Sequence, residues 1–223
     1  MNNPWRKLPA HAPFVLPADR PYVDVFNRTA SDGARAETTL LPEPFAGRTD
    51  APVVLLALNP GVHEQDFAWH RKPSFADRAR ACLERRAAEY PFYHLAPDAG
   101  WPGARWWTRV LGPLMAACGR AAVARGVLCV EYFPYHSRTF AHAHLRLPSQ
   151  EYSFHLVREA VRRDALVIVT RGARFWLGAV PELASYRRRL ATRSSRNVTI
   201  SPANCPDGFA LAARMLGASA SGT

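Results

Sequence analysis

Three short stretches of the chain place polar side chains directly after apolar runs. The first is Asn59-Pro60-Gly61 in "LLALNPG", the second runs from Glu131 to His136 in "VEYFPYH", and the third is Ser201 to Asn204 in "ISPAN". An amide can orient water, a carboxyl can act as a general base, and a hydroxyl can donate one hydrogen bond. Chemistry at one site requires that these stretches meet in space.

Four apolar runs, three of which end in these stretches, have the length and the aliphatic content of buried strands. They occupy residues 51–61, 126–137, 164–176 and 196–206. Helical patterns lie between them at residues 74–90, 104–124 and 149–164. This alternation predicts an α/β fold, a three-layer α/β/α sandwich around a four-stranded, mostly parallel sheet.

Ligands of such sheets lie beyond the carboxyl ends of the strands, so we expect the three polar stretches to converge on one crevice. Seven of the 19 prolines fall in residues 1–50. We therefore predict a Pro-rich N-terminal arm over residues 1–50, packed on a single α/β domain over residues 51–215. Residues 216–223 are predicted to form a disordered tail.

The charge of the chain favours a polyanionic partner. Lys and Arg number 29 against 18 Asp and Glu, which gives a net charge of +11, and only Lys7 and Lys72 are lysines. Arginine binds phosphate with two parallel hydrogen bonds and stacks on flat rings, so this charge is compatible with a nucleic acid as partner. The partner that we expect is DNA, duplex or single-stranded. A GC-rich genome enriches arginine as well, and composition leaves both explanations open.

The four cysteines, at positions 82, 118, 129 and 205, lack the close pairs typical of zinc or iron–sulfur sites. We therefore expect packed thiols, no metal and no cofactor. No apolar run approaches the roughly 18 residues of a membrane span, and no charged-then-apolar leader is present. The expectation is a monomeric cytoplasmic protein, associated with the nucleoid and not with a membrane.

The polar stretches carry a family resemblance. The strand followed by Asn59-Pro60-Gly61 resembles the first motif of the uracil-DNA glycosylase superfamily, especially its mismatch-specific and single-strand-selective branches. The stretch "ISPANCP" is similar to the second motif, a His-Pro-Ser or Asn-Pro-Ser loop after the last strand. Glu131 stands where the family has a base-recognising asparagine, with Pro134 in register. The resemblance covers roughly residues 50–215.

The resemblance implies a monofunctional DNA glycosylase of base excision repair, a hydrolase that flips a damaged or modified base and cleaves its N-glycosidic bond. Asn59 would orient the attacking water, Ser201 would stabilise the leaving base, and Glu131 would recognise the base. Ser201 supplies no charge, which weakens that stabilisation. An ionised Glu131 only accepts hydrogen bonds and suits a base with an exocyclic amine, whereas a protonated Glu131 could also donate.

Further side chains follow from the same resemblance. Stacking or contact with the flipped base falls to Trp69, Phe75, Phe133 and His136, and His63 and Glu64 are further candidates for base catalysis. Contacts with the DNA strand fall to these residues: Pro60, Gly61, Pro202, Asn204, Cys205, Arg171, Arg187 and Arg188. For each there is a structural alternative, namely core packing for the rings, turn formation for Asn59 and Ser201, and solvation for the arginines. The alternative function is a non-catalytic nucleic-acid-binding member of the same fold.

Overall fold

The computed structural model describes residues 1–217 and contains one five-stranded mixed sheet. The strand order is β1-β3-β2-β4-β5. The strands are β1 (Phe45–Gly47), β2 (Val53–Ala57), β3 (Val127–Glu131), β4 (Leu166–Val169) and β5 (Arg189–Ala191). β2 pairs in parallel with β3 and β4, β4 pairs in parallel with β5, and β1 runs antiparallel to β3. The predicted α/β class is therefore confirmed, with one strand more than expected.

Helices precede, connect and follow the strands. They are α1 (Arg20–Thr29), α2 (Asp66–Trp69), α3 (Pro73–Glu84), α4 (Pro102–Cys118), α5 (Arg120–Gly126), α6 (Gln150–Arg162), α7 (Ala173–Ala179) and α8 (Pro206–Met215). Three short 3-10 helices complete the order: η1 (Pro4–Lys7), η2 (Tyr93–Leu95) and η3 (Pro181–Ala184). Within the described chain, no helix combines the length and the apolar character needed to cross a membrane.

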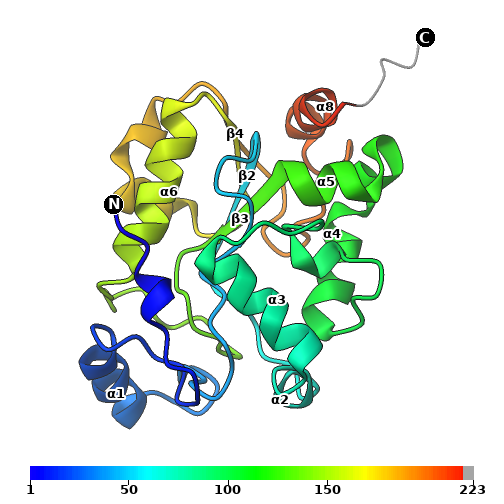
Figure 1. Cartoon of the computed structure of the whole chain (residues 1–223). Coiled ribbons are helices and arrows are strands. Elements are labelled where there is room, and N and C mark those ends of the chain that lie inside the picture. The colour runs from blue at the N-terminus through cyan, green and yellow to red at the C-terminus, as the bar shows by residue number, and fades with distance from the viewer. Residues whose placement is uncertain (218–223) are drawn as a thin grey trace, which may run out of the picture.

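The strand side chains alternate between two cores, one on each face of the sheet. Val53, Leu55 and Ala57 of β2 belong to the core that α3, α4, α5 and α8 cover. Val54 and Leu56 belong to the other core, under α6, α7 and the N-terminal arm. Figure 1 shows these two groups of helices on opposite sides of the sheet. Burial on both faces explains why the central strands are continuous apolar runs.

The strand predicted within residues 196–206 is wrong. Residues 197–200 have no sheet partner, and the N–H of Ile200 instead donates to the carbonyl of Val110 in α4. Val198 and Ile200 are buried against the helices of the first core. An extended segment packed on a helix shows the same alternation of apolar residues as a strand does. The outer strand on this side of the sheet is β5.

The boundaries of the helices and of the termini also differ from expectation. The helical pattern over 104–124 is two helices, which break at Gly119 with φ +84°. The N-terminal arm is part of the fold, since it supplies β1 and buries Trp5 in the second core. Leu216, expected in the tail, is buried, while residues 218–223 lie outside the described residues.

Gly47 provides a direct test of the β1–β3 pairing. Its φ is +110°, and a Cβ there would lie 2.2 Å from the carbonyl oxygen of Val127. We predict that Gly47→Ala lowers the free energy of unfolding by on the order of 3 kcal/mol, through backbone strain and steric overlap. Urea denaturation measures this change.

The matched control is Gly112→Ala in α4, where an added Cβ meets no atom within 4 Å. Its expected effect is a stabilisation of no more than about 1 kcal/mol, from the higher helix propensity of alanine. Equal stabilities for the two variants would show that β1 is not paired as described.

Candidate functional site

A cavity of about 430 Å³ lies at the carboxyl ends of β2, β3 and β4. Glu131, the last residue of β3, lines it together with Asn59 and Arg171, which lie two residues beyond β2 and β4. The opposite wall comes from α4 and from the segment around α2. The expected crevice beyond the strand ends is therefore present, although only two of the three predicted polar stretches reach it.

A larger hollow of about 960 Å³ lies near the amino ends of the parallel strands. Its charged side chains pair with one another across the surface, for example Arg48 with Asp50 and Arg78 with Asp98. Exposed ion pairs of this kind are satisfied without a ligand. The smaller cavity contains buried polar groups and is the better candidate for a functional site.

Asn59 is held in one orientation. Its Nδ2 donates to Ser137 Oγ at 2.9 Å, to the Ser137 carbonyl at 3.2 Å and to the Pro60 carbonyl at 3.0 Å. No hydrogen bond to its Oδ1 occurs within residues 1–217. The side chain therefore fixes the turn, as the structural alternative required, and leaves an acceptor at the cavity.

Glu131 ends β3 as a buried carboxyl with incomplete hydrogen bonding. The residue is 8% exposed, its Oε1 faces Cys129 Sγ at 3.8 Å, and its Oε2 has no hydrogen-bond partner. Burial raises the pKa of Glu131 to about 8, the negative charge of Glu43 adds to the increase, and Arg171 opposes it. At neutral pH the group is a neutral acid, with one donor and one acceptor.

Glu43 is a second carboxyl in the cavity, and sequence reasoning missed it. It lies in the segment before β1, and its side chain is 13% exposed. Burial alone would raise the pKa of Glu43, but His94, His136 and His70 together lower it to about 2. Glu131 and Glu43 therefore hold opposite protonation states at neutral pH, and burial raises the pKa of the third carboxyl of the cavity, Asp66.

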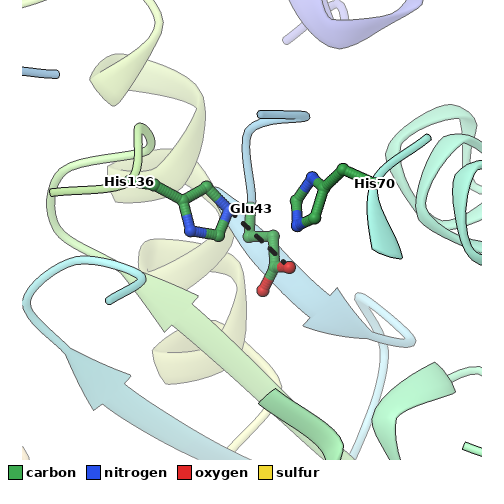
Figure 2. Close-up of side chains that lie close together, drawn as sticks. All are labelled: Glu43, His70 and His136. Carbon is green, nitrogen blue, oxygen red and sulfur yellow. Dashed lines mark ion pairs between the residues drawn. The ribbon is translucent and has the colours of Figure 1, made fainter. Parts of the chain in front are cut away.

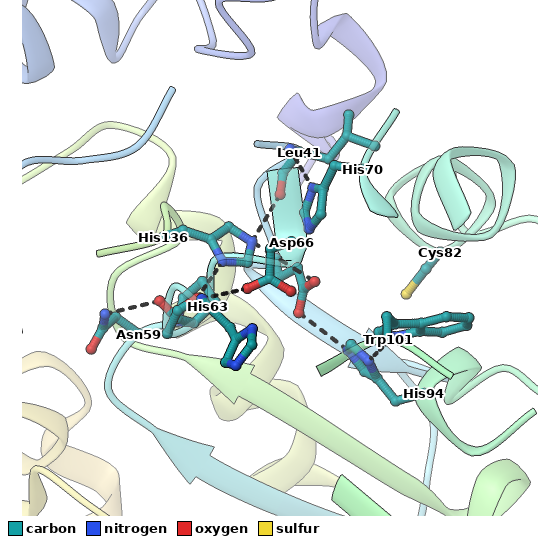
Figure 3. A network of polar contacts seen from close by, with 12 residues as sticks. Leu41, Asn59, His63, Asp66, His70, Cys82, His94, Trp101 and His136 are labelled. Carbon is teal, nitrogen blue, oxygen red and sulfur yellow. Dashed lines mark hydrogen bonds and ion pairs between the residues drawn. The ribbon is translucent and has the colours of Figure 1, made fainter. Parts of the chain in front are cut away.

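Hydrogen bonds determine which nitrogen of each neighbouring histidine carries a proton. Trp101 Nε1 donates to His94 Nδ1 at 2.8 Å, so the His94 Nε2–H donates to Glu43 Oε2 at 3.1 Å. The N–H of Leu41 donates to His70 Nδ1 at 2.9 Å, which places the His70 proton on Nε2. Figure 3 shows this network. Burial lowers the pKa of His70 to about 3, so its ring stays neutral.

His136 connects two loops at the wall of the cavity. Its Nδ1 lies 2.7 Å from the Gly61 carbonyl and its Nε2 lies 3.0 Å from the Leu41 carbonyl. Carbonyl oxygens only accept, so the ring satisfies both contacts when both nitrogens are protonated. Its Nε2 is also 3.8 Å from Glu43 Oε1. The ring lies at the cavity, as predicted, but its nitrogens are used within the protein.

Glu43, His70 and His136 together are the cluster that could hold a metal ion. One ligating atom of each lies within 4.8 Å of the others, and Figure 2 shows the two rings on either side of Glu43. A histidine binds a metal through an unprotonated nitrogen. In His70 one nitrogen accepts from Leu41 and the other is protonated, and both nitrogens of His136 face carbonyls. This hydrogen bonding does not fit metal ligation.

Three of the five predicted base-binding side chains line the cavity, namely Glu131, Phe75 and His136. Phe75 packs edge-on against Trp101, with ring centroids 5.2 Å apart. Trp69 does not line the cavity and instead lies under the Lys72 ammonium, at 3.6 Å. Phe133 stacks on His142 in the second core, at 3.8 Å. Trp101 was missed, because no periodic pattern distinguishes it from a core residue.

The predicted third stretch lies outside the cavity. Ser201 Oγ accepts from the backbone N–H of Asn204, the structural alternative for this residue. The Asn204 side chain bonds to Ser194, Asn197 and Thr199, Cys205 is buried, and Pro202 is exposed. The loop after residues 197–200 packs on the chain that follows β5, where the N–H of Arg193 donates to the Asn204 carbonyl at 2.8 Å, and it does not line the cavity beside β2 and β3. The expected convergence of Ser201 with Asn59 and Glu131 is wrong.

The predicted DNA-contacting residues divide between the carboxyl ends and the amino ends of the parallel strands. Pro60, Gly61 and Arg171 line the cavity, and Arg171 Nε donates to the Ser195 carbonyl at 3.0 Å. Arg187 and Arg188 precede β5, which runs parallel to β4, so they lie at the opposite edge. Arg188 pairs there with Asp164 at 3.0 Å. The cavity is also lined by residues that were not predicted: Glu43, Asp66, His70, Trp101 and Arg138.

The candidates for base catalysis just after the first motif also separate. His63 lines the cavity, with its backbone N–H bonded to the buried carboxylate oxygen Asp66 Oδ2 at 2.7 Å. Glu64 is exposed and pairs with Arg138 at 3.0 Å.

Comparison of the chain with protein-family models, with curated proteins and with solved structures gives no match. The fold and the cavity therefore define an α/β protein with a ligand-sized site at the carboxyl edge of its sheet.

The raised pKa of Glu131 predicts a pH-dependent stability. Below its ordinary pKa of 4.5 both folded and unfolded states are protonated. Between pH 4.5 and about 8 the unfolded state loses the proton and the folded state keeps it, so stability falls as pH rises. Relative to Glu131→Gln, the loss is a few kcal/mol in total, at about 1.4 kcal/mol per pH unit at most.

Urea denaturation of wild type and Glu131→Gln across this pH range measures the difference. Glu89→Gln, a substitution at an exposed position, is the control and should follow the wild type. A constant difference between wild type and Glu131→Gln at all pH values would mean that Glu131 is ionised like a surface carboxyl.

Proposed function

We propose that the cavity receives a nucleobase turned out of a DNA strand and that its side chains hydrolyse the N-glycosidic bond. The protein would then act as a DNA glycosylase-like hydrolase of base excision repair. The observation that carries this proposal is the presence of Asn59 and Glu131, from adjacent strand ends, in one cavity with aromatic walls. The sequence resemblance, which Asn59 and Glu131 also carry, supports the same reading.

The size and the lining of the cavity suit a nucleobase. Its volume of about 430 Å³ falls within the range of small-ligand pockets, roughly 300–1,000 Å³. Phe75 and Trp101 offer flat apolar surface for a base, and Arg138 and Arg171 supply positive charge for phosphates. The net charge of +11 would steer the protein toward DNA.

Glu131 in its neutral form offers the same hydrogen-bonding groups as an amide. Its O–H can donate to a base carbonyl, and its C=O can accept from the neighbouring ring N–H. This pair matches the edge of uracil and related oxidised or deaminated bases better than that of an amine-bearing base. A partner from the base would also satisfy the orphaned Oε2, whose burial without a partner is unfavourable.

The two carboxyls provide the charge pattern that the reaction needs. Cleavage of a glycosidic bond builds positive charge on the sugar and negative charge on the leaving base. The ionised Glu43 would stabilise the sugar cation, and the O–H of Glu131 would stabilise the negative charge on the base carbonyl. Glu131 thereby takes the role that the resemblance assigned to Ser201.

Excision from oligonucleotides that carry deaminated, oxidised or alkylated bases tests the proposal, with alkaline cleavage at the resulting abasic sites as the readout. Glu131→Gln keeps a donor and an acceptor and should retain activity within about tenfold, whereas Glu131→Ala should lose on the order of 100-fold. Above pH 8 the wild type should lose activity and Glu131→Gln should not. Intact oligonucleotides throughout the panel at high protein concentration would refute the catalytic proposal.

A non-catalytic nucleic-acid-binding function is the second candidate. The position of Ser201 outside the cavity favours it, because the second motif then supplies no catalytic group. In that case DNA would bind with a strong dependence on salt, and no abasic sites would form.

Both candidates predict an effect of Arg171. Arg171→Ala should weaken the binding of single-stranded oligonucleotides about threefold to tenfold and reduce the salt dependence of affinity by about one phosphate contact. Arg187→Ala, at the opposite edge of the sheet, is the control and should change affinity less than twofold, roughly the loss of general charge attraction. Fluorescence anisotropy at a series of salt concentrations measures both. A larger effect of Arg187→Ala than of Arg171→Ala would place the DNA at the amino ends of the parallel strands.

A further inference from the structure

We infer that Glu43 and His70 together bind a single oxygen atom, and that in the proposed hydrolysis this oxygen belongs to the attacking water. The assignment to water rests on the proposed function. The oxygen site itself follows from the arrangement of the two side chains and their tautomers.

The spacing of the two groups suits one bridging oxygen. One ligating atom of Glu43 and one of His70 lie within 4.8 Å of each other. Among the contacts of the described residues, the hydrogen bonds and ion pairs of these two side chains go to other partners. If an oxygen lies about 2.8 Å from each of two atoms separated in this way, the angle at the oxygen between the two atoms is about 120° or less. Water forms its hydrogen bonds near the tetrahedral angle. One oxygen can therefore bond to both groups without a movement of either side chain.

The two groups are also complementary in polarity. Because the N–H of Leu41 occupies Nδ1 of His70, the proton on Nε2 is available for donation. Glu43 Oε2 accepts from His94, and Oε1 lies 3.8 Å from His136 Nε2. The Tyr93 hydroxyl is a further neighbour of this carboxylate, and its pKa is raised by burial and by Glu43. Glu43 would accept one hydrogen of the water, and His70 would donate to one of its lone pairs. The second lone pair remains free to attack.

The reaction balances with these groups alone. The bond between the sugar C1′ and the base nitrogen breaks, and its electron pair leaves with the base, whose carbonyl is hydrogen-bonded by Glu131. The free lone pair of the water forms the new O–C1′ bond, and the proton passes to Glu43. The base takes a proton from Glu131 or solvent, and exchange with solvent restores both carboxyls. Water attached to an oxocarbenium carbon is strongly acidic, so a weakly basic carboxylate suffices as acceptor.

Glu43, His70 and His136 would need a different arrangement of protons to bind a metal ion. A metal would need an unprotonated His70 Nε2, which would move the proton to Nδ1 and break the bond from the Leu41 N–H. The oxygen site and the metal site are therefore mutually exclusive, and each predicts a different occupant at the same place.

A crystal structure of the wild-type protein grown with zinc in the medium, together with elemental analysis, tests the oxygen site directly. The expected result is density for one oxygen at about 2.8 Å from Glu43 and from His70, without stoichiometric metal. A metal ion with bonds of about 2.0–2.2 Å to Glu43 and His70, or density for neither, would overturn the inference.

Single-turnover excision tests the identity of the oxygen. Glu43→Gln should lower the rate at least about 100-fold while oligonucleotide affinity stays within about threefold, a separation that loss of folding does not produce. Asn59→Ala should lower the rate less than Glu43→Gln, and Glu182→Gln on the surface is the control. A larger effect of Asn59→Ala would assign the water to Asn59 instead. If the wild type excises no base, the proposed function fails, and the crystal structure still decides the oxygen site.

Discussion

A negative charge buried among imidazole rings is the constraint on which the structure of the site depends. Burial of the Glu43 carboxylate is unfavourable unless hydrogen bonds and positive charge replace its water. His94 donates to it directly and is itself oriented by Trp101. His136 helps to lower the pKa of Glu43 and joins the loops of Leu41 and Gly61. Segments far apart in the sequence thus meet around one carboxylate.

Glu131, another carboxyl of the cavity, has no histidines bonded to it as Glu43 does. Glu131 is buried at the end of a central strand, beside the weak donor of Cys129 and at some distance from the Arg171 charge. Its pKa therefore rises, whereas that of Glu43 falls. Two groups of the same chemical type become a neutral donor and a fixed anion within one cavity. This difference is the physical basis of the proposed function.

The central part of the fold could be predicted from the sequence. β2, β3 and β4 are continuous apolar runs because both of their faces are buried, and the rule that ligands lie beyond strand ends placed Asn59 and Glu131 at the cavity. β1 and β5 are three residues each and carry no comparable pattern. The run around Ile200 alternates like a strand but packs on α4, which is why the position of Ser201 was mispredicted.

Most of the polar wall could not be predicted. Glu43 lies in a loop and His70 at the end of a short helix, and His94, which bonds to Glu43 from behind the wall, lies in a 3-10 helix. In these segments no periodicity indicates the direction of a side chain. Their single shared feature is proximity in space, which only the tertiary structure reveals. The one local signal is the position of Glu43 between two prolines, and this fixes the backbone without indicating chemistry.

The central claim is that two carboxyls in one cavity hold opposite protonation states. The most direct measurement is an NMR titration of the side-chain carboxyl carbons, with Glu43→Gln and Glu131→Gln used to assign the two resonances. The account predicts a titration near pH 8 for Glu131 and near pH 2 for Glu43. Titration of both groups near their ordinary value of 4.5 would contradict it.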